Sequence, residues 1–266
     1  MSVEEKKKTK YLVSINNLDD ILKYKKVGIS TFLFALKDYS IGYQSTYSYL
    51  EINNVKEKKY VLINQVLNND SIDKLKDILL KLDVEGFIFE DIGLINIFKE
   101  LNIKGKKILF MNHFNCNYES INEWLNYVDN VFVSNELTYD ELKEITTKVN
   151  KEVILHVFGY NQVMYSKRYL LSNYYKYNNE DIKLKNTIKD KASDIKYHVL
   201  ENEYGTVFLS NKIFDGRRLL DLNNVLYYYL NTSFIKTDEV IKFINNEEID
   251  NTDNGFLDTK TIYKLK

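Results

Sequence analysis

The chain has 266 residues, and its 37 lysines and arginines nearly balance its 38 aspartates and glutamates, which leaves a formal net charge of -1 at pH 7. Such a balance gives no bulk attraction to nucleic acid or to an anionic membrane. A single cysteine, Cys116, excludes an internal disulfide framework and a metal site built from cysteines alone. The absence of proline and the 22 tyrosines indicate an AT-rich genome more than a function.

No apolar stretch approaches the roughly 18 residues that a membrane-spanning helix needs. The first ten residues, MSVEEKKKTK, lack the apolar core of a signal peptide. We therefore expect a cytoplasmic protein without membrane contact.

Short runs rich in β-branched and aromatic residues recur along the chain, and each is too short for a buried helix. These predicted strands cover residues 11–15, 31–36, 60–67, 86–90, 107–112, 130–135, 152–158 and 233–237. Helical patterns lie between them, for example over 71–82, where apolar residues recur every three or four positions. Thr138 and Glu141 form a capping box, which predicts a helix that runs to about residue 149.

Alternating strands and helices predict a parallel sheet, since parallel neighbours need long return connections. At this length, eight β/α units favour a TIM-type (β/α)8 barrel. An open doubly wound sheet is the alternative, but no glycine-rich phosphate turn follows an early strand.

The long interval between the seventh and eighth predicted strands interrupts the regular alternation of strands and helices. Apolar and polar residues alternate on both sides of Glu203-Tyr204-Gly205, which predicts a β-hairpin. Residues 219–229 have a helical pattern. We expect a single domain over 1–266, with an insertion at about 178–218.

Catalytic residues of barrel enzymes lie at the carboxyl ends of the strands. In this chain those positions hold Glu90, Asp91, Asn112, His113, Asn135, Glu136, Thr237 and Asp238. Glu90 and Glu136 are candidates for acid–base work, and Asn112 for lining the same mouth. Helix capping is the competing interpretation for any one of these residues, but Thr138 offers the cap next to Glu136 and leaves that carboxylate free.

Familiar catalytic signatures such as GxSxG, HExxH, the phosphate loop and GxGxxG do not occur. The three histidines are too widely spaced to form a recognisable metal-ligand pattern. His156 alternates within an apolar run, which favours a core histidine over a catalytic one.

Two stretches, VFVSNELTYDELKEI and EVILHVFGYNQVMYSKRYLLSNYYKYN, resemble motifs of the peptidase U32 (collagenase-like) family. Glu136, Leu137 and Glu141 match the first motif. The second motif is matched at Glu152, Gly159, Tyr165, Ser166, Leu171 and Ser172. NHFNCN places Asn117 at a family asparagine, and the ending DNGFLDTKTIYKLK is similar to the family's final segment. Short single-barrel members from Firmicutes and Mollicutes share the Ser-Lys-Arg ending found at 166–168.

The chain departs from the family motif at three positions, two of which hold cysteines in the motif. Phe158 replaces the motif histidine, while Gln162 and Tyr169 replace its two cysteines. In relatives implicated in hydroxylation of tRNA or of quinone precursors, such cysteines help to hold an iron–sulfur cluster, which needs about four thiolates. We therefore expect neither a cluster nor another metal in this chain.

The resemblance implies a U32-type barrel that acts in tRNA wobble-uridine hydroxylation, or one of the putative collagenase-like peptidases, with a tRNA or a peptide as substrate. We expect a subunit without a cluster, in a heteromer with a longer cysteine-bearing relative. Lys167 and Arg168 would hold an anionic group, and Asn117 and Gln162 would also contact substrate. The alternative is a catalytically degenerate barrel that serves as a binding or scaffold partner.

Overall fold

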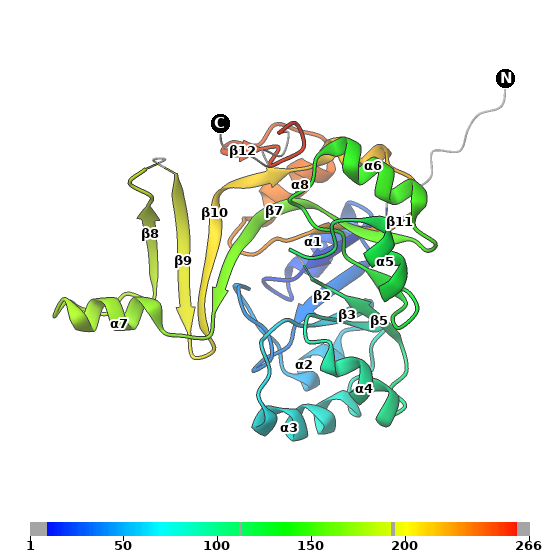
Figure 1. Cartoon of the computed structure of the whole chain (residues 1–266), viewed down its shortest axis with the longest axis horizontal. Coiled ribbons are helices and arrows are strands. Elements are labelled where there is room, and N and C mark those ends of the chain that lie inside the picture. Colours follow the sequence, from blue (N-terminus) through cyan, green and yellow to red (C-terminus); the bar gives the residue numbers. More distant parts are fainter. Residues whose placement is uncertain (1–9, 112, 193–194, 260–266) are drawn as a thin grey trace.

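The computed structural model describes residues 10–111, 113–192 and 195–259. The body of the molecule is built from parallel strands alternating with helices (Figure 1). Its strands are β1 (Tyr11–Ser14), β2 (Thr31–Ala35), β3 (Lys58–Ile63), β4 (Gly86–Phe89), β5 (Lys106–Leu109), β6 (Asn130–Val131), β7 (Val153–Ser166) and β11 (Val225–Leu230). Its helices are α1 (Asp20–Lys26), α2 (Tyr49–Asn54), α3 (Asn69–Leu79), α4 (Gly93–Glu100), α5 (Tyr118–Trp124), α6 (Tyr139–Lys148) and α8 (Thr237–Ile244).

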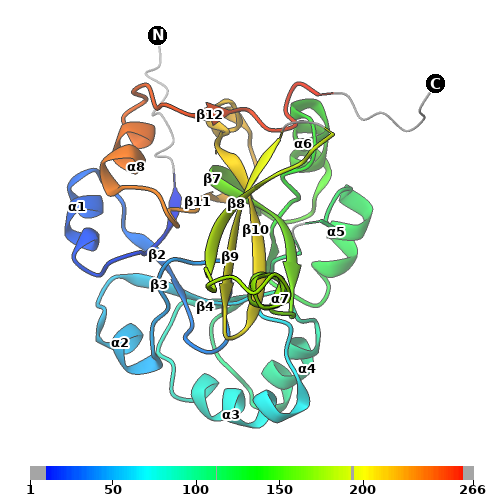
Figure 2. The ribbon, with the colours of Figure 1, turned by 90° about the vertical axis from the view of Figure 1, so that its left-hand side faces the viewer.

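The parallel strands follow the order β6-β5-β4-β3-β2-β1-β11-β7. Just beyond β6, Phe132 forms a single parallel bridge with Ile154 of β7. Figure 2 shows the helices of the body around the outside of these strands. The predicted α/β alternation is confirmed. So is the capping box, in which Thr138 accepts a hydrogen bond from the Glu141 amide at the start of α6.

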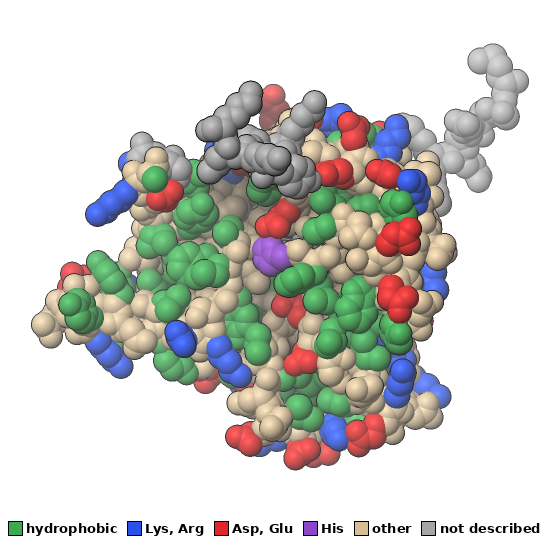
Figure 3. All heavy atoms as spheres, viewed as in Figure 1, with side chains coloured by type: hydrophobic (Ala, Val, Ile, Leu, Met, Phe, Trp, Pro, Cys, Tyr) green, Lys and Arg blue, Asp and Glu red, His purple; other side chains and the backbone are tan. Residues whose placement is uncertain are grey.

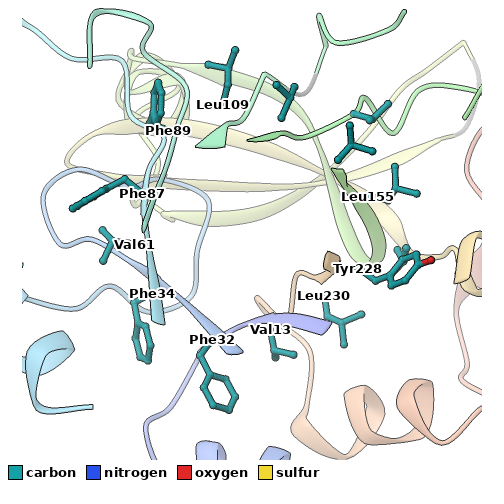
Figure 4. Close-up of a cluster of buried hydrophobic side chains, with 14 of the residues drawn as sticks. Val13, Phe32, Phe34, Val61, Phe87, Phe89, Leu109, Leu155, Tyr228 and Leu230 are labelled. Carbon is teal, nitrogen blue, oxygen red and sulfur yellow. The ribbon is translucent and has the colours of Figure 1, made fainter. Parts of the chain in front are cut away.

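Both faces of the parallel strands are buried, as expected for a sheet with helical crossovers. Val13, Phe32, Val61 and Phe87 belong to the larger core cluster, which packs against the helices (Figure 4). The alternate residues of the same strands form a second, smaller cluster on the opposite face. Its buried members are Leu12, Leu33, Tyr60, Leu62, Ile88, Ile108, Phe110, Phe132, Ile154, Leu226 and Tyr229. Successive side chains of each strand point to opposite faces of the sheet, and this alternation separates the two cores.

A second unit, which we call the arm, projects from the body (Figure 1). The 14-residue strand β7 runs beyond the parallel strands and pairs antiparallel with β10 (Gly205–Asp215). The sheet continues through β9 (Lys196–Asn202) and β8 (Lys185–Lys189), and α7 (Leu170–Tyr177) packs on it. The predicted hairpin is confirmed, because β9 and β10 flank Glu203 and Tyr204. The short strand β12 (Thr252–Asp253) also pairs with β10.

Three local predictions were wrong. The seventh strand, predicted to end at residue 158, continues to Ser166. The predicted helix at 219–229 is a 3-10 turn, η1 (Arg217–Asp221), followed by β11, because Asn224 has a φ of 60° and ends the helical path. The eighth strand is therefore β11, while the predicted strand at 233–237 is a loop in which Phe234 has a φ of 65°.

In the described part of the chain, no helix combines the length and the apolar character required to cross a bilayer.

Candidate functional site

A cavity of about 240 Å³ lies at the carboxyl ends of β4 and β5, beside β7. Its lining mixes apolar walls with two carboxyls, two carboxamides and an imidazole, and comprises Gln65, Val66, Glu90, Asp91, Phe110, Met111, His113, Phe114 and Gln162. Two predicted site residues, Glu90 and Gln162, thus meet here from elements 72 residues apart in the sequence. We call this the Glu90 cavity. It lies where the arm leaves the body, a region in which Figure 3 shows acidic side chains around a histidine.

The carboxyl of Glu90 is held in an environment that favours its neutral form. Burial raises the pKa of Glu90 to about 8, and a hydrogen bond with Asn64 opposes this shift only in part. At neutral pH the group is therefore mostly protonated, so that its O–H can donate a hydrogen bond into the cavity. With Gln65 and Gln162 beside it, the site offers uncharged donors and acceptors between apolar walls.

Glu136, the second predicted acid–base residue, lies outside this lining but pairs with a residue that belongs to it. Its carboxylate oxygen Oε1 is 3.0 Å from Nδ1 of His113, and both side chains are partly exposed. A carboxylate on Nδ1 fixes the orientation of the ring and favours the tautomer with hydrogen at that atom. The Glu136–His113 pair is thus positioned at the edge of the Glu90 cavity.

A buried polar group that the sequence patterns did not reveal lies beside these residues. Tyr43, in the loop after β2, and Tyr229, on β11, have hydroxyl oxygens 2.7 Å apart. Burial raises the pKa of both tyrosines, so they remain neutral phenols. Asn64 anchors the same loop, because its side chain accepts a hydrogen bond from the Ile41 amide and donates one to the Ile41 carbonyl. The thirteen residues between β2 and α2 were the available signal, since loops at this edge carry function in α/β folds.

His156 is a core histidine, as the sequence predicted. Its Nε2 donates to the Phe158 carbonyl at 2.8 Å, which leaves Nδ1 to accept from Nδ2 of Asn135 at 3.3 Å. Burial is the main reason that the pKa of His156 falls to about 4. The ring packs on Phe214 and Tyr229 and stays neutral at physiological pH.

Lys167 and Arg168 lie just beyond the end of β7, at the border between arm and body. The Lys167 ammonium donates to the Val66 carbonyl at 3.1 Å and lines a second cavity of about 500 Å³. Gln65 and Val66 belong to both cavities, so the two spaces adjoin. Arg168 is exposed, and its guanidinium forms no hydrogen bond or ion pair with another described residue.

The other predicted residues that the structure describes are not gathered at the Glu90 cavity. Asn112 lies outside the described residues. Asn117 caps α5, where its side-chain oxygen accepts from the Ser120 amide at 2.9 Å. Thr237 and Asp238 line a separate polar cavity of about 1050 Å³ between the loops that follow β1, β2 and β11.

Two of the side chains that replace residues of the family motif have other roles in the structure. Phe158 is fully buried against Phe243, with ring centroids 4.5 Å apart. The Tyr169 hydroxyl donates to the Glu203 carbonyl at 2.8 Å. Cys116 lies elsewhere, before α5, and burial raises the pKa of its thiol. This donor set does not fit an iron–sulfur cluster, and the described residues contain no group of three or more His, Cys, Asp or Glu placed to hold a metal ion.

Comparison with known proteins gives a family match and one curated relative. The profile of Peptidase family U32 matches residues 44–212, which include every residue that lines the Glu90 cavity and nearly all of the arm. The tRNA hydroxylation protein P2 of Bacillus subtilis (strain 168) is 27% identical over 226 residues, which is 77% of this chain and 72% of that protein.

Two solved structures resemble the chain weakly. The U32 peptidase Mk0906 gives a TM-score of 0.47 at 13% identity, over 60% of this chain and 72% of that one. The C-terminal domain of a putative chitinase from Desulfitobacterium hafniense DCB-2 gives a TM-score of 0.41 at 12% identity, over 90% and 99%.

Proposed function

The chain belongs to peptidase family U32, and we propose that it is a component of tRNA wobble-uridine hydroxylation. The observation that carries this proposal is the 27% identity to tRNA hydroxylation protein P2, which extends over about three quarters of both chains. A tRNA substrate also implies a cytoplasmic location.

The parallel strands form a TIM-type (β/α)8 barrel in this proposal. Two observations support it: the strand order runs from β6 to β7, and the Phe132–Ile154 bridge links those two ends. The smaller core cluster collects residues from seven of these strands and from the segment after β6, as the filled interior of a barrel would. The Glu90 cavity then lies at the face where such barrels place their chemistry.

The roles of the site residues follow from their environment. Glu90 is the proton donor and hydrogen-bond donor of the site, since burial keeps its carboxyl protonated. Glu136 orients His113 at the cavity edge, and Gln162 supplies a carboxamide that can both donate and accept. Lys167 and Arg168 contact the phosphates of the substrate. Asn112 and Asn117 complete the predicted contacts.

The chain works as the cluster-free subunit of a heteromer with a cysteine-bearing U32 relative. Phe158, Gln162 and Tyr169 support this idea, because none of them can supply a thiolate. The same three residues favour the second candidate function, a catalytically degenerate barrel that only scaffolds its partner. The two candidates differ in whether residues of the Glu90 cavity take part in catalysis.

The test is the content of hydroxylated wobble uridine in tRNA, measured by nucleoside mass spectrometry. Deletion of the gene should abolish the modification, and the wild-type chain should restore it. A Glu90→Ala chain that fails to restore it supports the first candidate, whereas full restoration supports the scaffold. Undiminished modification in the deletion strain would refute both. Iron that co-purifies only when the relative is present would locate the cluster in the partner.

Peptidase activity is the function to exclude in the same preparation. Cleavage of gelatin or of a peptide by the purified chain, lost in the Glu90→Ala variant, would replace the hydroxylation proposal.

A further inference from the structure

The stretch that contains the second family motif is free of acidic residues. Between Glu152 and Glu180, 27 consecutive residues include no aspartate or glutamate, although the chain's average frequency would place about four there. The same stretch contains three cations, Lys167, Arg168 and Lys176. Although the whole chain is nearly neutral, this segment is therefore locally basic.

This segment ends in α7, which lies on the arm (Figure 2) and carries exposed tyrosine and lysine side chains. Tyr174 is 57% exposed and Tyr177 is 88% exposed. Lys176 lies between them in the sequence, and Arg168 precedes the helix. Neither cation forms an ion pair with a described residue, whereas lysines of the body such as Lys23, Lys25, Lys76 and Lys148 do. We call Arg168, Tyr174, Lys176 and Tyr177 the α7 surface.

The helix that carries this surface is firmly held by the arm. Leu171 and Tyr175 are buried and pack with Val199 of β9. The buried carboxylate of Glu201 accepts hydrogen bonds from the Leu171 amide at 2.7 Å and the Ser172 amide at 3.1 Å. Because this carboxylate occupies the amino end of α7, a bound anion would have to be held by the side chains of the surface.

The α7 surface is linked to the Glu90 cavity by the chain that precedes it. Lys167 donates to the carbonyl of Val66, and Val66 lines the cavity. Arg168 follows Lys167 directly, and α7 begins two residues later. Lys167 and Arg168 thus lie between the lining of the cavity and the start of α7.

We propose that the α7 surface binds single-stranded RNA, and that it holds the nucleotides that flank the base in the Glu90 cavity. Unpaired bases stack on tyrosine rings, and phosphates pair with lysine and arginine. This inference rests on the proposed function, which supplies tRNA as the partner. Lysine is depleted from protein interfaces, so Lys176 favours a phosphate over a protein partner.

The experiment measures binding of an unmodified tRNA transcript to the full-length chain by fluorescence anisotropy at several salt concentrations. The first variant, Tyr174→Ala/Tyr177→Ala, should raise the Kd at least about fivefold, the lower limit for losing one base stack. For the second variant, Lys176→Ala, the plot of the logarithm of the binding constant against the logarithm of the salt concentration should be less steep. The magnitude of its negative slope should decrease by about 0.7, as expected for the loss of one phosphate contact on a single strand. Matched controls on the body are Tyr127→Ala, at a tyrosine that is 51% exposed, and Lys26→Ala.

Both α7 variants should melt at the wild-type temperature, because the replaced side chains are exposed. An anticodon stem-loop should compete for binding, and a fully paired duplex should not. Equal Kd values for the α7 variants and the body controls would overturn the inference. So would loss of a co-purifying protein with unchanged tRNA binding, which would mark a protein interface.

The inference and the proposed function fail separately. A wild-type chain without affinity for tRNA overturns the inference, even if gene deletion abolishes hydroxylation. Binding through α7 with normal hydroxylation in the deletion strain overturns the proposed function alone.

Discussion

Replacing Glu90 by glutamine should make the protein more stable at alkaline pH. Glutamine has nearly the same shape and is neutral at every pH, so it mimics the protonated carboxyl that the cavity favours. The wild-type carboxyl must ionise as the pH rises through its pKa of about 8, and the folded state resists this because the group is buried.

The sign and the size follow from proton linkage. A glutamate in the unfolded chain has a pKa of about 4.3, so between pH 4.3 and pH 8 the folded state binds one more proton than the unfolded state. Stability is therefore highest at low pH in this window and falls as the pH rises. Two pH units separate pH 6 from the folded pKa, and each is worth about 1.4 kcal/mol. The wild type should lose up to about 3 kcal/mol between pH 6 and pH 9 through this group alone.

The assay is urea unfolding of wild-type and Glu90→Gln protein at pH 6, 7, 8 and 9. The difference in the free energy of unfolding, variant minus wild type, should grow by about 3 kcal/mol from pH 6 to pH 9, with most of the increase complete by pH 8. The same substitution at Glu201 serves as a control with the opposite expected sign. Parallel pH profiles for wild type and Glu90→Gln would refute the assignment of a protonated carboxyl in the cavity.

Three further variants test other parts of the structure. Although burial acts to raise the pKa of Glu201, hydrogen bonds from side chains and amides outweigh it and hold this pKa low; Glu201→Gln should therefore cost about 2 kcal/mol at pH 7, and less as acidification removes the wild type's advantage. Gly159→Ala should cost more than about 2 kcal/mol in urea unfolding, because φ is +124° and the new Cβ would lie 2.1 Å from the Asn231 carbonyl oxygen. Gly93→Ala is its control, since that Cβ would meet only a side-chain oxygen at 3.0 Å, and an equal cost in both would contradict the steric argument. Arg168→Ala should weaken tRNA binding with an unchanged melting temperature, and unchanged binding would remove this residue from the site.

Much of the fold could be predicted because local patterns and tertiary structure agree. The apolar runs of β1 to β6 and of the first half of β7 are too short for helices and are largely buried on both faces, so composition alone identifies them. The capping box at Thr138 and the hairpin at 203–205 are encoded by neighbouring residues and need no distant partner.

The failures have a different origin. Residues 219–229 have helical leucine spacing, but Asn224 in the left-handed region and pairing with both β1 and β7 make the second half a strand. The extension of β7 into the arm depends on β10, which follows it by about 40 residues. No local sequence pattern indicates that these two strands pair.

The candidate site was only partly accessible from sequence for the same reason. Glu90 was predicted because catalytic residues of barrels lie at strand ends, and Gln162 was predicted from the family resemblance. Both residues line the same cavity. The Tyr43–Tyr229 contact joins residues 186 positions apart, which no motif in this chain encodes. The burial that raises the pKa of Glu90 also depends on the three-dimensional packing around it.

The most direct test is the ratio of hydroxylated to unmodified wobble uridine in tRNA from cells that lack this chain. Our account predicts that the modification disappears, that the wild-type chain restores it and that the Glu90→Ala chain does not. A ratio that stays at the wild-type level in the deletion strain would contradict the account.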